Sequence, residues 1–211
     1  MPIDGPMYPV NLMVQDRPCL VVGGGRVAAQ KALGLLECGA VVHIIATAVG
    51  PAVRAIERAT WDERPYREGD CEGYWLVITA TDDPEVNRAV AAEATQRRVW
   101  VNSADDPDNC SFTLPSRFRR GPLLVAVSTG GHSPAFATWL RGRLEAEIGP
   151  EFEVLLGILT EEREEIRASG RSSEGLDWHK ALDSEMLELV REGRLAEAKE
   201  RLQACLSSSS A

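Results

Sequence analysis

The sequence predicts an α/β protein: a Rossmann-type doubly wound parallel sheet, followed by a small α+β segment and a helical C-terminal domain. Three observations lead to this fold class. Apolar runs alternate with helix-like runs between residues 19 and 102, which is typical of parallel sheets covered by helices. The first apolar run ends in three consecutive glycines. After residue 108 the alternation stops, and a mainly helical, acidic sequence follows. We therefore expect three domains, at residues 1–115, 116–149 and 150–211.

Composition limits the possible functions. The 211 residues are 44% hydrophobic and 26% charged, which is ordinary for a globular protein. The net charge of -9 argues against binding to nucleic acid or to an anionic membrane. The five cysteines are scattered without a C-x-x-C spacing, so we expect neither disulfides nor a zinc site. Because no secretory leader and no membrane-spanning apolar run is present, we expect a cytoplasmic protein.

A short edge strand is expected at residues 8–13. The strand expected next, at residues 19–22, leads into the most informative stretch of the sequence. Its spacing Gly23-x-Gly25-x-x-Ala28 fits the dinucleotide fingerprint. The first glycine makes the tight turn, the second lets a pyrophosphate approach the backbone, and the small third residue lets helix and strand pack closely. The helix is expected from about residue 27 to 38, and its free N–H groups favour an anion. The cofactor contacts predicted here are Gly23, Gly24, Gly25, Arg26 and Val27.

The next strand, expected at residues 41–45, lacks one part of the fingerprint. A dinucleotide domain usually has an acidic residue near the end of this strand, where it binds the adenosine ribose. Here Ile45-Ala46-Thr47-Ala48 stands in that place. We place the ribose contacts at Thr47 and Ala48, through the hydroxyl and the backbone. Since neither the acid nor a clear arginine for a 2′-phosphate is present, the choice between NAD and NADP stays open.

Polar residues follow two further strands of the predicted sheet. Ligands bind beyond the carboxyl ends of parallel strands, where we expect Thr81 and Asn102 to contact the cofactor. Asp105 and Asp106 come after the last strand, and a carboxylate beside a nicotinamide ring can accept a proton as hydride departs. The alternative is a plain Asp-Asp-Pro turn. The elements expected in this part are helices at 50–59 and 83–97, and strands at 61–65, 75–79 and 99–102.

The segment after residue 108 is strand-like and basic. Residues 111–115 and 122–128 are strand-like with no helix between them, so we expect a sheet that pairs with another subunit. A helix is expected to follow, to about residue 148. Between residues 117 and 143 there are five arginines and no acid. Because arginine forks match carboxylates, this segment is either a site for a polyanionic small molecule or a solvated surface.

Six short motifs are spread in order over about residues 8–148. Together they resemble the precorrin-2 dehydrogenases, a family that includes the dehydrogenase and ferrochelatase module of siroheme synthase. Six collinear motifs are far more specific than one glycine turn. The remainder of the chain is similar to the family's C-terminal domain only in being helical. The motifs are Tyr8-Pro9-Val10-x-Leu12, Val22-Gly23-Gly24-Gly25-x-Val27-Ala28, Ala80-Thr81-Asp82-Asp83 with Asn87, Val101-Asn102-x-x-Asp105-Asp106, Ser111-Phe112-x-x-Pro115-Ser116 and Gly121-Pro122-Leu123-x-Val125-Ala126-Val127-Ser128-x-Gly130-Gly131-x-Ser133-Pro134.

The resemblance implies a function and a site. It implies oxidation of precorrin-2 to sirohydrochlorin with NAD on the route to siroheme, by a homodimer intertwined through the segment after the Rossmann fold. Some family members also insert Fe2+. Asp105 matches the residue implicated in catalysis, as a proton acceptor. Ser128 matches a position that is phosphorylated in some siroheme synthases, and His132 departs from the family's usual residue. The predicted contacts to the polycarboxylate substrate are Arg117, Arg119, Arg120, Ser128 and His132.

Two other classes of enzyme lack their signature residues in this sequence. A short-chain reductase would need Tyr-x-x-x-Lys, which none of the three tyrosines provides, and a zinc-dependent dehydrogenase would need metal ligands. The three histidines have no metal-binding spacing, so no resident metal is expected. Two alternatives remain open: a non-catalytic NAD-sensing or tetrapyrrole-binding dimer, and a dehydrogenase without chelatase activity.

Overall fold

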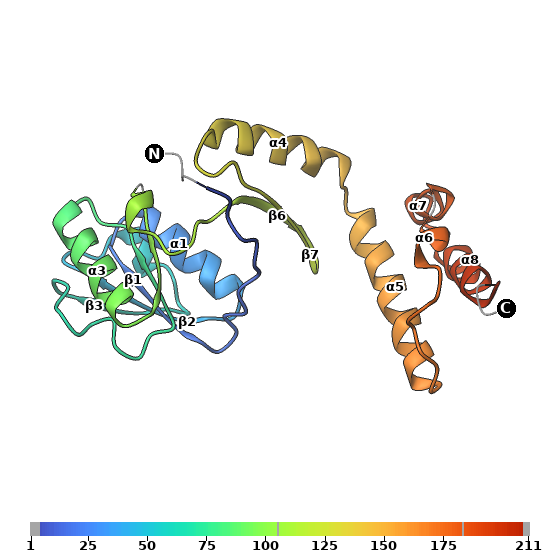
Figure 1. The fold of residues 1–211 in the computed structure, drawn as a ribbon, viewed down its shortest axis with the longest axis horizontal. Coiled ribbons are helices and arrows are strands. Elements are labelled where there is room, and N and C mark those ends of the chain that lie inside the picture. Colours follow the sequence, from blue (N-terminus) through green and yellow to red (C-terminus); the bar gives the residue numbers. More distant parts are fainter. Residues whose placement is uncertain (1–4, 105, 183, 209–211) are drawn as a thin grey trace. The chain divides into compact units, whose positions relative to one another are not determined.

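The computed structural model of the chain (Figure 1) describes residues 5–104, 106–182 and 184–208. The chain divides into two compact units, each with its own hydrophobic core. Unit 1 consists of the chain up to Leu114 together with Gly130–Ser133. Unit 2 consists of Pro115–Thr129 together with the chain from Pro134 onward.

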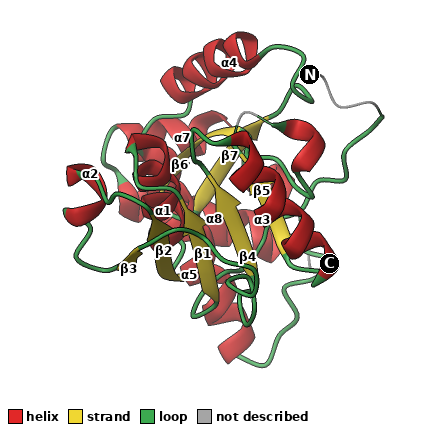
Figure 2. Cartoon of the chain, turned by 90° about the vertical axis from the view of Figure 1, so that its left-hand side faces the viewer, coloured by secondary structure: helices red, strands yellow, loops and turns green. Residues whose placement is uncertain are grey.

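Unit 1 contains the predicted doubly wound sheet. Its five strands are all parallel and lie in the order β3-β2-β1-β4-β5 (Figure 2). From β1 the chain moves outward to β2 and β3, and then returns to β4 on the other side of β1. The carboxyl ends of β1 and β4 therefore flank the point where the strand order reverses, which is where open α/β sheets bind ligands. The strands are β1 (Pro18–Val22), β2 (Val41–Ala46), β3 (Thr60–Glu63), β4 (Leu76–Thr79) and β5 (Trp100–Ser103).

Helices cover both faces of this sheet. Successive residues of β1 point to opposite faces, so that Val21 belongs to the core beneath α1 and Leu20 to the core beneath α3. Both side chains are fully buried, and each such burial contributes about 1.5–3 kcal/mol. The central strand β1 therefore packs against the helices on both faces of the sheet. The helical elements of unit 1 are α1 (Arg26–Glu37), α2 (Pro51–Arg54), α3 (Pro84–Gln96) and the 3-10 turn η1 (Pro107–Asn109).

Two predictions for unit 1 differ from the structure: one predicted strand is absent, and one predicted helix is shorter than expected. Residues 8–13, predicted as an edge strand, form no strand: Pro9 lacks an N–H, and Tyr8 and Met13 are more than four-fifths exposed. The helix predicted at 50–59 is reduced to α2, in which only Val53 is buried. Of the five cysteines, Cys19 and Cys71 are buried, and Cys38, Cys110 and Cys205 are half-buried.

Unit 2 begins with an antiparallel hairpin of β6 (Ser116–Arg120) and β7 (Leu123–Val127). Residues 116–120, which lie between the two predicted strands, are themselves a strand, and the strand predicted at 111–115 is absent. Phe118 is buried between the exposed Arg117 and Arg119, so the charged run alternates as a half-buried strand does. The helix α4 (Pro134–Glu147) packs on this hairpin.

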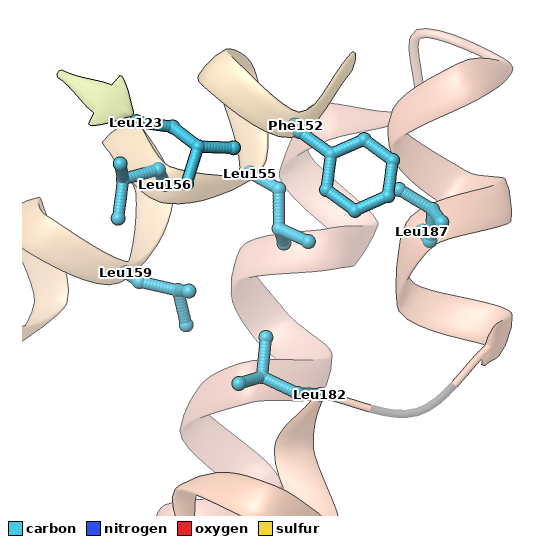
Figure 3. A pocket seen from close by; sticks show the side chains of 7 residues that line it. All are labelled: Leu123, Phe152, Leu155, Leu156, Leu159, Leu182 and Leu187. Carbon is cyan, nitrogen blue, oxygen red and sulfur yellow. The ribbon is translucent and has the colours of Figure 1, made fainter. Parts of the chain in front are cut away.

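The remainder of unit 2 is helical, as predicted. It contains α5 (Glu151–Ala168), α6 (Trp178–Ala181), α7 (Ser184–Arg191) and α8 (Leu195–Ser208), which share a core with the fully buried Met186 and Leu202. Beside this core lies an apolar pocket of about 370 Å³, into which side chains from β7, α5 and α7 project (Figure 3). Within the described ranges, no helix is both long and apolar enough to cross a membrane. The pocket is lined by Leu123, Phe152, Leu155, Leu156, Leu159, Leu182 and Leu187.

Candidate functional site

The glycine turn between β1 and α1 is held between two neighbouring loops. Gly23 has a φ of 137°, and a Cβ atom there would lie 2.3 Å from the carbonyl oxygen of Ala80. A Cβ on Gly24 would lie 1.9 Å from the carbonyl oxygen of Ala48. The chain therefore needs glycine at both positions, because the loops after β4 and β2 pass directly against the turn. The Gly23 N–H also donates to Ile45 at 2.9 Å.

The N-terminus of α1 is open toward the space in front of this turn. Gly25 is its N-cap and has no side chain to accept from the first-turn N–H groups, and the first turn contains no acidic residue. A Cβ on Gly25 would meet no atom within 4 Å. Arg26 and Val27 are exposed beside it. Uncapped N–H groups and the helix dipole make this a cradle for a phosphate group, so the residues present fit a dinucleotide.

The loop after β2 borders the same turn. Thr47 and Ala48 are exposed directly after the last residue of the strand. Gly50 donates its N–H to the Gly24 carbonyl at 3.0 Å, which ties the end of this loop to the glycine turn. The five residues predicted for the pyrophosphate and the two predicted for the ribose are therefore brought together.

The loop after β4 is organised by a buried asparagine. Asn87, in the first turns of α3, donates from Nδ2 to the Thr81 carbonyl at 2.9 Å and accepts from the Thr81 hydroxyl at 2.8 Å. The Thr79 hydroxyl also donates to Asn87. Thr81 thus lies at the predicted edge, but its hydroxyl is already engaged. Asn87 stands in a family motif, yet its role as the holder of this loop is visible only in the fold.

The end of β5 is tied to the segment that follows it. The Asn102 amide donates to the Phe112 carbonyl at 3.0 Å, so this side chain holds the chain after η1 rather than pointing freely into the site. The Ser103 N–H donates to the Cys110 sulfur at 3.1 Å, and burial raises the pKa of that thiol. Asp105, the predicted proton acceptor, lies outside the described residues. Its neighbour Asp106 accepts from Asn109 at 2.7 Å within the same turn.

The residues predicted to bind the substrate do not share one surface. Arg117 and Arg119 lie on one face of β6, while Arg120 lies on the other. The Arg120 guanidinium donates to the carbonyls of Ile148 at 3.0 Å and Glu145 at 3.1 Å, at the C-terminal end of α4. Arg120 therefore stabilises unit 2. Two further predicted residues, Ser128 and His132, are exposed in the chain after β7.

No group of three acidic, histidine or cysteine side chains within the described ranges is arranged to hold a metal ion. The polar atoms of the site are instead backbone N–H groups, hydroxyls and amides. Such groups suit an anionic, hydroxyl-rich ligand.

Two families match this chain. Residues 10–116, just over half of it, match the family described as "Putative NAD(P)-binding", and residues 120–147 match the family described as "Sirohaem biosynthesis protein central". The first match covers β1 to β5 and the second covers β7 and α4.

Individual proteins agree with the families. The siroheme synthase of Methylococcus capsulatus is 39% identical over 90% of this chain and 41% of its own length, and that of Methylobacillus flagellatus is 37% identical over 94% and 44%. The chain thus spans less than half the length of these curated relatives. The solved structure of SirC, a precorrin-2 dehydrogenase, superposes with a TM-score of 0.73 and 26% identity, over 94% of this chain and 98% of its own.

These matches and the glycine turn agree on NAD as the cofactor. They agree with the six motifs as well, which lie within the matched residues or directly beside them. The chain therefore belongs to the family described as "Putative NAD(P)-binding", and its residues 120–147 match the central segment of sirohaem biosynthesis proteins.

Proposed function

We propose that this chain oxidises precorrin-2 to sirohydrochlorin, with NAD+ as the hydride acceptor, in siroheme biosynthesis. The observation that carries the proposal is the glycine turn, which presents an uncapped helix N-terminus at the point where the strand order of the sheet reverses. The similarity to a precorrin-2 dehydrogenase over nearly the whole chain supports the choice of substrate.

The residues around the turn have distinct tasks in this proposal. The N–H groups of Arg26 and Val27 bind the pyrophosphate, and Thr47 and Ala48 border the adenosine ribose. Thr81, held by Asn87, borders the nicotinamide ribose. Asn102 keeps the chain after β5 in place beside the ring, through its bond to Phe112.

The oxidation removes two hydrogens from the substrate. One leaves as hydride, which NAD+ accepts when bound, and the other leaves as a proton. We assign Asp105 as the acceptor of that proton, because it comes two residues after the end of β5 in the sequence and because the neighbouring Asp106 is engaged by Asn109.

The basic hairpin supplies contacts to the carboxylates of the substrate. Arg117 and Arg119 project from the face of β6 opposite to Arg120, where they can pair with carboxylates as two-pronged donors. We assign Ser128 and His132 to the same substrate, and we assign Arg120 to the end of α4. Residues 116–149 form the dimerisation segment of this proposal, between a dinucleotide domain at 1–115 and a helical domain at 150–211, in a cytoplasmic homodimer.

Insertion of Fe2+ into sirohydrochlorin is a second candidate activity. The curated relatives are named siroheme synthases, and siroheme contains iron. In that step Asp105 would take up protons from the pyrrole nitrogens as the metal enters.

Anaerobic turnover tests both activities. Purified protein is mixed with precorrin-2 and NAD+, NADH and sirohydrochlorin are followed by absorbance, and Fe2+ is added when oxidation is complete. NADH formation establishes the dehydrogenase, and metal insertion faster than in a protein-free control establishes the chelatase. If NAD+ binds but no NADH forms, the chain is a binding or sensing protein instead.

The variant Asp105→Asn tests the assigned acceptor. We expect NADH formation to fall by at least about 100-fold, the usual contribution of a general base, while NAD+ affinity and thermal stability stay as in the wild type. Asp108→Asn is the matched control, because Asp108 is an exposed acid in the adjoining turn. Equal losses in both variants would mean that the turn, and not the Asp105 carboxylate, matters.

A further inference from the structure

A carboxylate from β3 lies beside the loop in which the usual ribose-binding acid is missing. β3 runs parallel to β2, and Glu63 at its end is paired in register with Ala46, the last residue of β2. Neighbouring residues of paired strands project from the same face of the sheet, so Glu63 shares the face of Ala46. A Cβ on Gly24 would lie 2.9 Å from the Ala46 side chain, so this is also the face of the glycine turn.

The Glu63 carboxylate is fixed by two partners. One oxygen accepts from the Val49 N–H at 3.3 Å, and the other accepts from the Arg54 guanidinium at 2.6 Å. Arg54 also donates to the Val49 carbonyl at 3.0 Å, so the pair braces the loop after Thr47. These contacts, first the N–H of Val49 and then Arg54, hold the pKa of Glu63 below its ordinary value, and the group is negatively charged at neutral pH.

This loop is where the adenosine half of a dinucleotide has to pass. Its residues touch the glycine turn on one side, through Ala48 and Gly50, and Glu63 on the other, through Val49. With the pyrophosphate on α1, the half of the cofactor that leaves toward β2 crosses this loop, and the half that leaves toward β4 approaches the chemistry. The side chains of Glu63 and Arg54 are 41% and 47% exposed, so a ligand can reach them.

We propose that Glu63 makes the site selective for NAD over NADP. It takes the place of the acid that other dinucleotide domains carry at the end of β2, and its negative charge opposes the 2′-phosphate of NADP. Its ion pair with Arg54 also keeps that guanidinium from binding the phosphate. The inference rests on the proposed dinucleotide site and adds its specificity.

Equilibrium binding of the two cofactors, measured by titration calorimetry without substrate, tests this inference. Glu63→Gln keeps one acceptor oxygen, for either Val49 or Arg54, and removes the charge. We expect the ratio of the Kd for NADP+ to the Kd for NAD+ to fall by about ten-fold or more, mainly through tighter NADP+ binding. Arg54→Gln leaves the Glu63 charge without a counterion, so the same ratio should rise.

Asp62→Asn is the matched control. Asp62 precedes Glu63 in β3, has a side chain exposed to a similar degree at 49%, and projects from the opposite face toward His43 and Arg64. Removing its charge should leave the ratio of the two Kd values unchanged. Thermal unfolding of each variant checks that the sheet is intact.

The outcomes separate this inference from the proposed function. If the wild type binds NAD+ more tightly than NADP+ but both Glu63→Gln and Arg54→Gln keep the wild-type ratio, the specificity role is wrong and the dinucleotide site stands. If Asp62→Asn changes the ratio as much as Glu63→Gln, general charge and not Glu63 is responsible. If the wild type binds neither cofactor, the proposed function fails and this inference fails with it.

Discussion

At the scale of single residues, Gly24 and Gly25 are neighbours with different constraints. A methyl group on Gly24 would overlap the Ala48 carbonyl, whereas one on Gly25 would enter open space in front of α1. We expect Gly24→Ala to lower the free energy of unfolding by about 2 kcal/mol, the typical cost of overpacking. We expect Gly25→Ala to unfold as the wild type does but to raise the Kd for NAD+ by about ten-fold, because the methyl group crowds the pyrophosphate.

Thermal unfolding and calorimetric titration of both variants check this prediction. Each variant is the control for the other, because both add one methyl group, at adjacent positions. Wild-type affinity for NAD+ in Gly25→Ala would place the pyrophosphate elsewhere.

Single residues also show which parts of the site can be predicted from the sequence and which cannot. The glycine turn was predictable because its function is local: strand, turn and helix N-terminus are all contained in about ten residues around Gly24. Arg120, Asn87 and Glu63 act through partners that lie outside their own helix or strand. Arg120 belongs to a run that suggests an anion site, yet its guanidinium binds carbonyls more than twenty residues away. No spacing rule shows such a contact before the fold is known.

At the scale of elements, the connection between β3 and β4 contains no helix and depends on a buried acid. Glu93, on α3 and 7% exposed, accepts from the N–H of Gly69 at 3.0 Å, from Arg97 at 2.7 Å and from the Tyr66 hydroxyl. Burial by itself would raise the pKa of this carboxyl, but these hydrogen bonds outweigh it, and the pKa is lowered. The loop from β3 to β4 is therefore held on α3 by one ionised group.

Glu93 makes the stability of unit 1 dependent on pH. Because its pKa is lower in the folded than in the unfolded chain, its contribution is present above the unfolded value of about 4.3 and is lost as the pH falls through the folded value. We expect Glu93→Gln to lower the free energy of unfolding at pH 7 by about 1–3 kcal/mol, since buried donors lose a charged acceptor. The loss should shrink as the pH is lowered below about 4.

Urea unfolding between pH 3 and pH 7 measures both effects. Glu72→Gln is the matched control, because Glu72 is an exposed acid whose carboxylate pairs with the same Arg97 at 3.4 Å. A difference between Glu93→Gln and the wild type that stays constant with pH would show that ionisation of Glu93 does not matter to the fold.

Elements were predictable where burial alone sets their type. β1, β2 and β4 are nearly continuous apolar runs covered on both faces, and the sequence places each within two residues of its observed bounds. β6 was missed because four of its five residues are polar or charged, and only Phe118 marks the buried face. Its pairing with β7 decides its conformation, and that pairing is a tertiary contact.

At the scale of the whole molecule, the hairpin and α4 leave apolar surface uncovered. In α4 only Ala137 is buried, while Phe136 and Trp139 are 50% and 56% exposed with their ring centroids 5.6 Å apart. β6 and β7 pair only with each other among the described strands. Unpaired strand edges and a patch of exposed aromatic side chains are typical of a surface that another chain covers.

We therefore expect a homodimer that depends on α4. Phe136→Glu combined with Trp139→Glu should convert the dimer to a monomer in light scattering after size-exclusion chromatography, because two carboxylates would be desolvated at the interface. Leu195→Glu is the control, since Leu195 is an apolar residue of α8 that is 41% exposed. NAD+ affinity should stay within about three-fold of the wild type in the monomer, because the glycine turn lies wholly in unit 1. A double variant that stays dimeric would place the interface on another surface. A wild-type protein that is monomeric would contradict the assignment of residues 116–149 as a dimerisation segment.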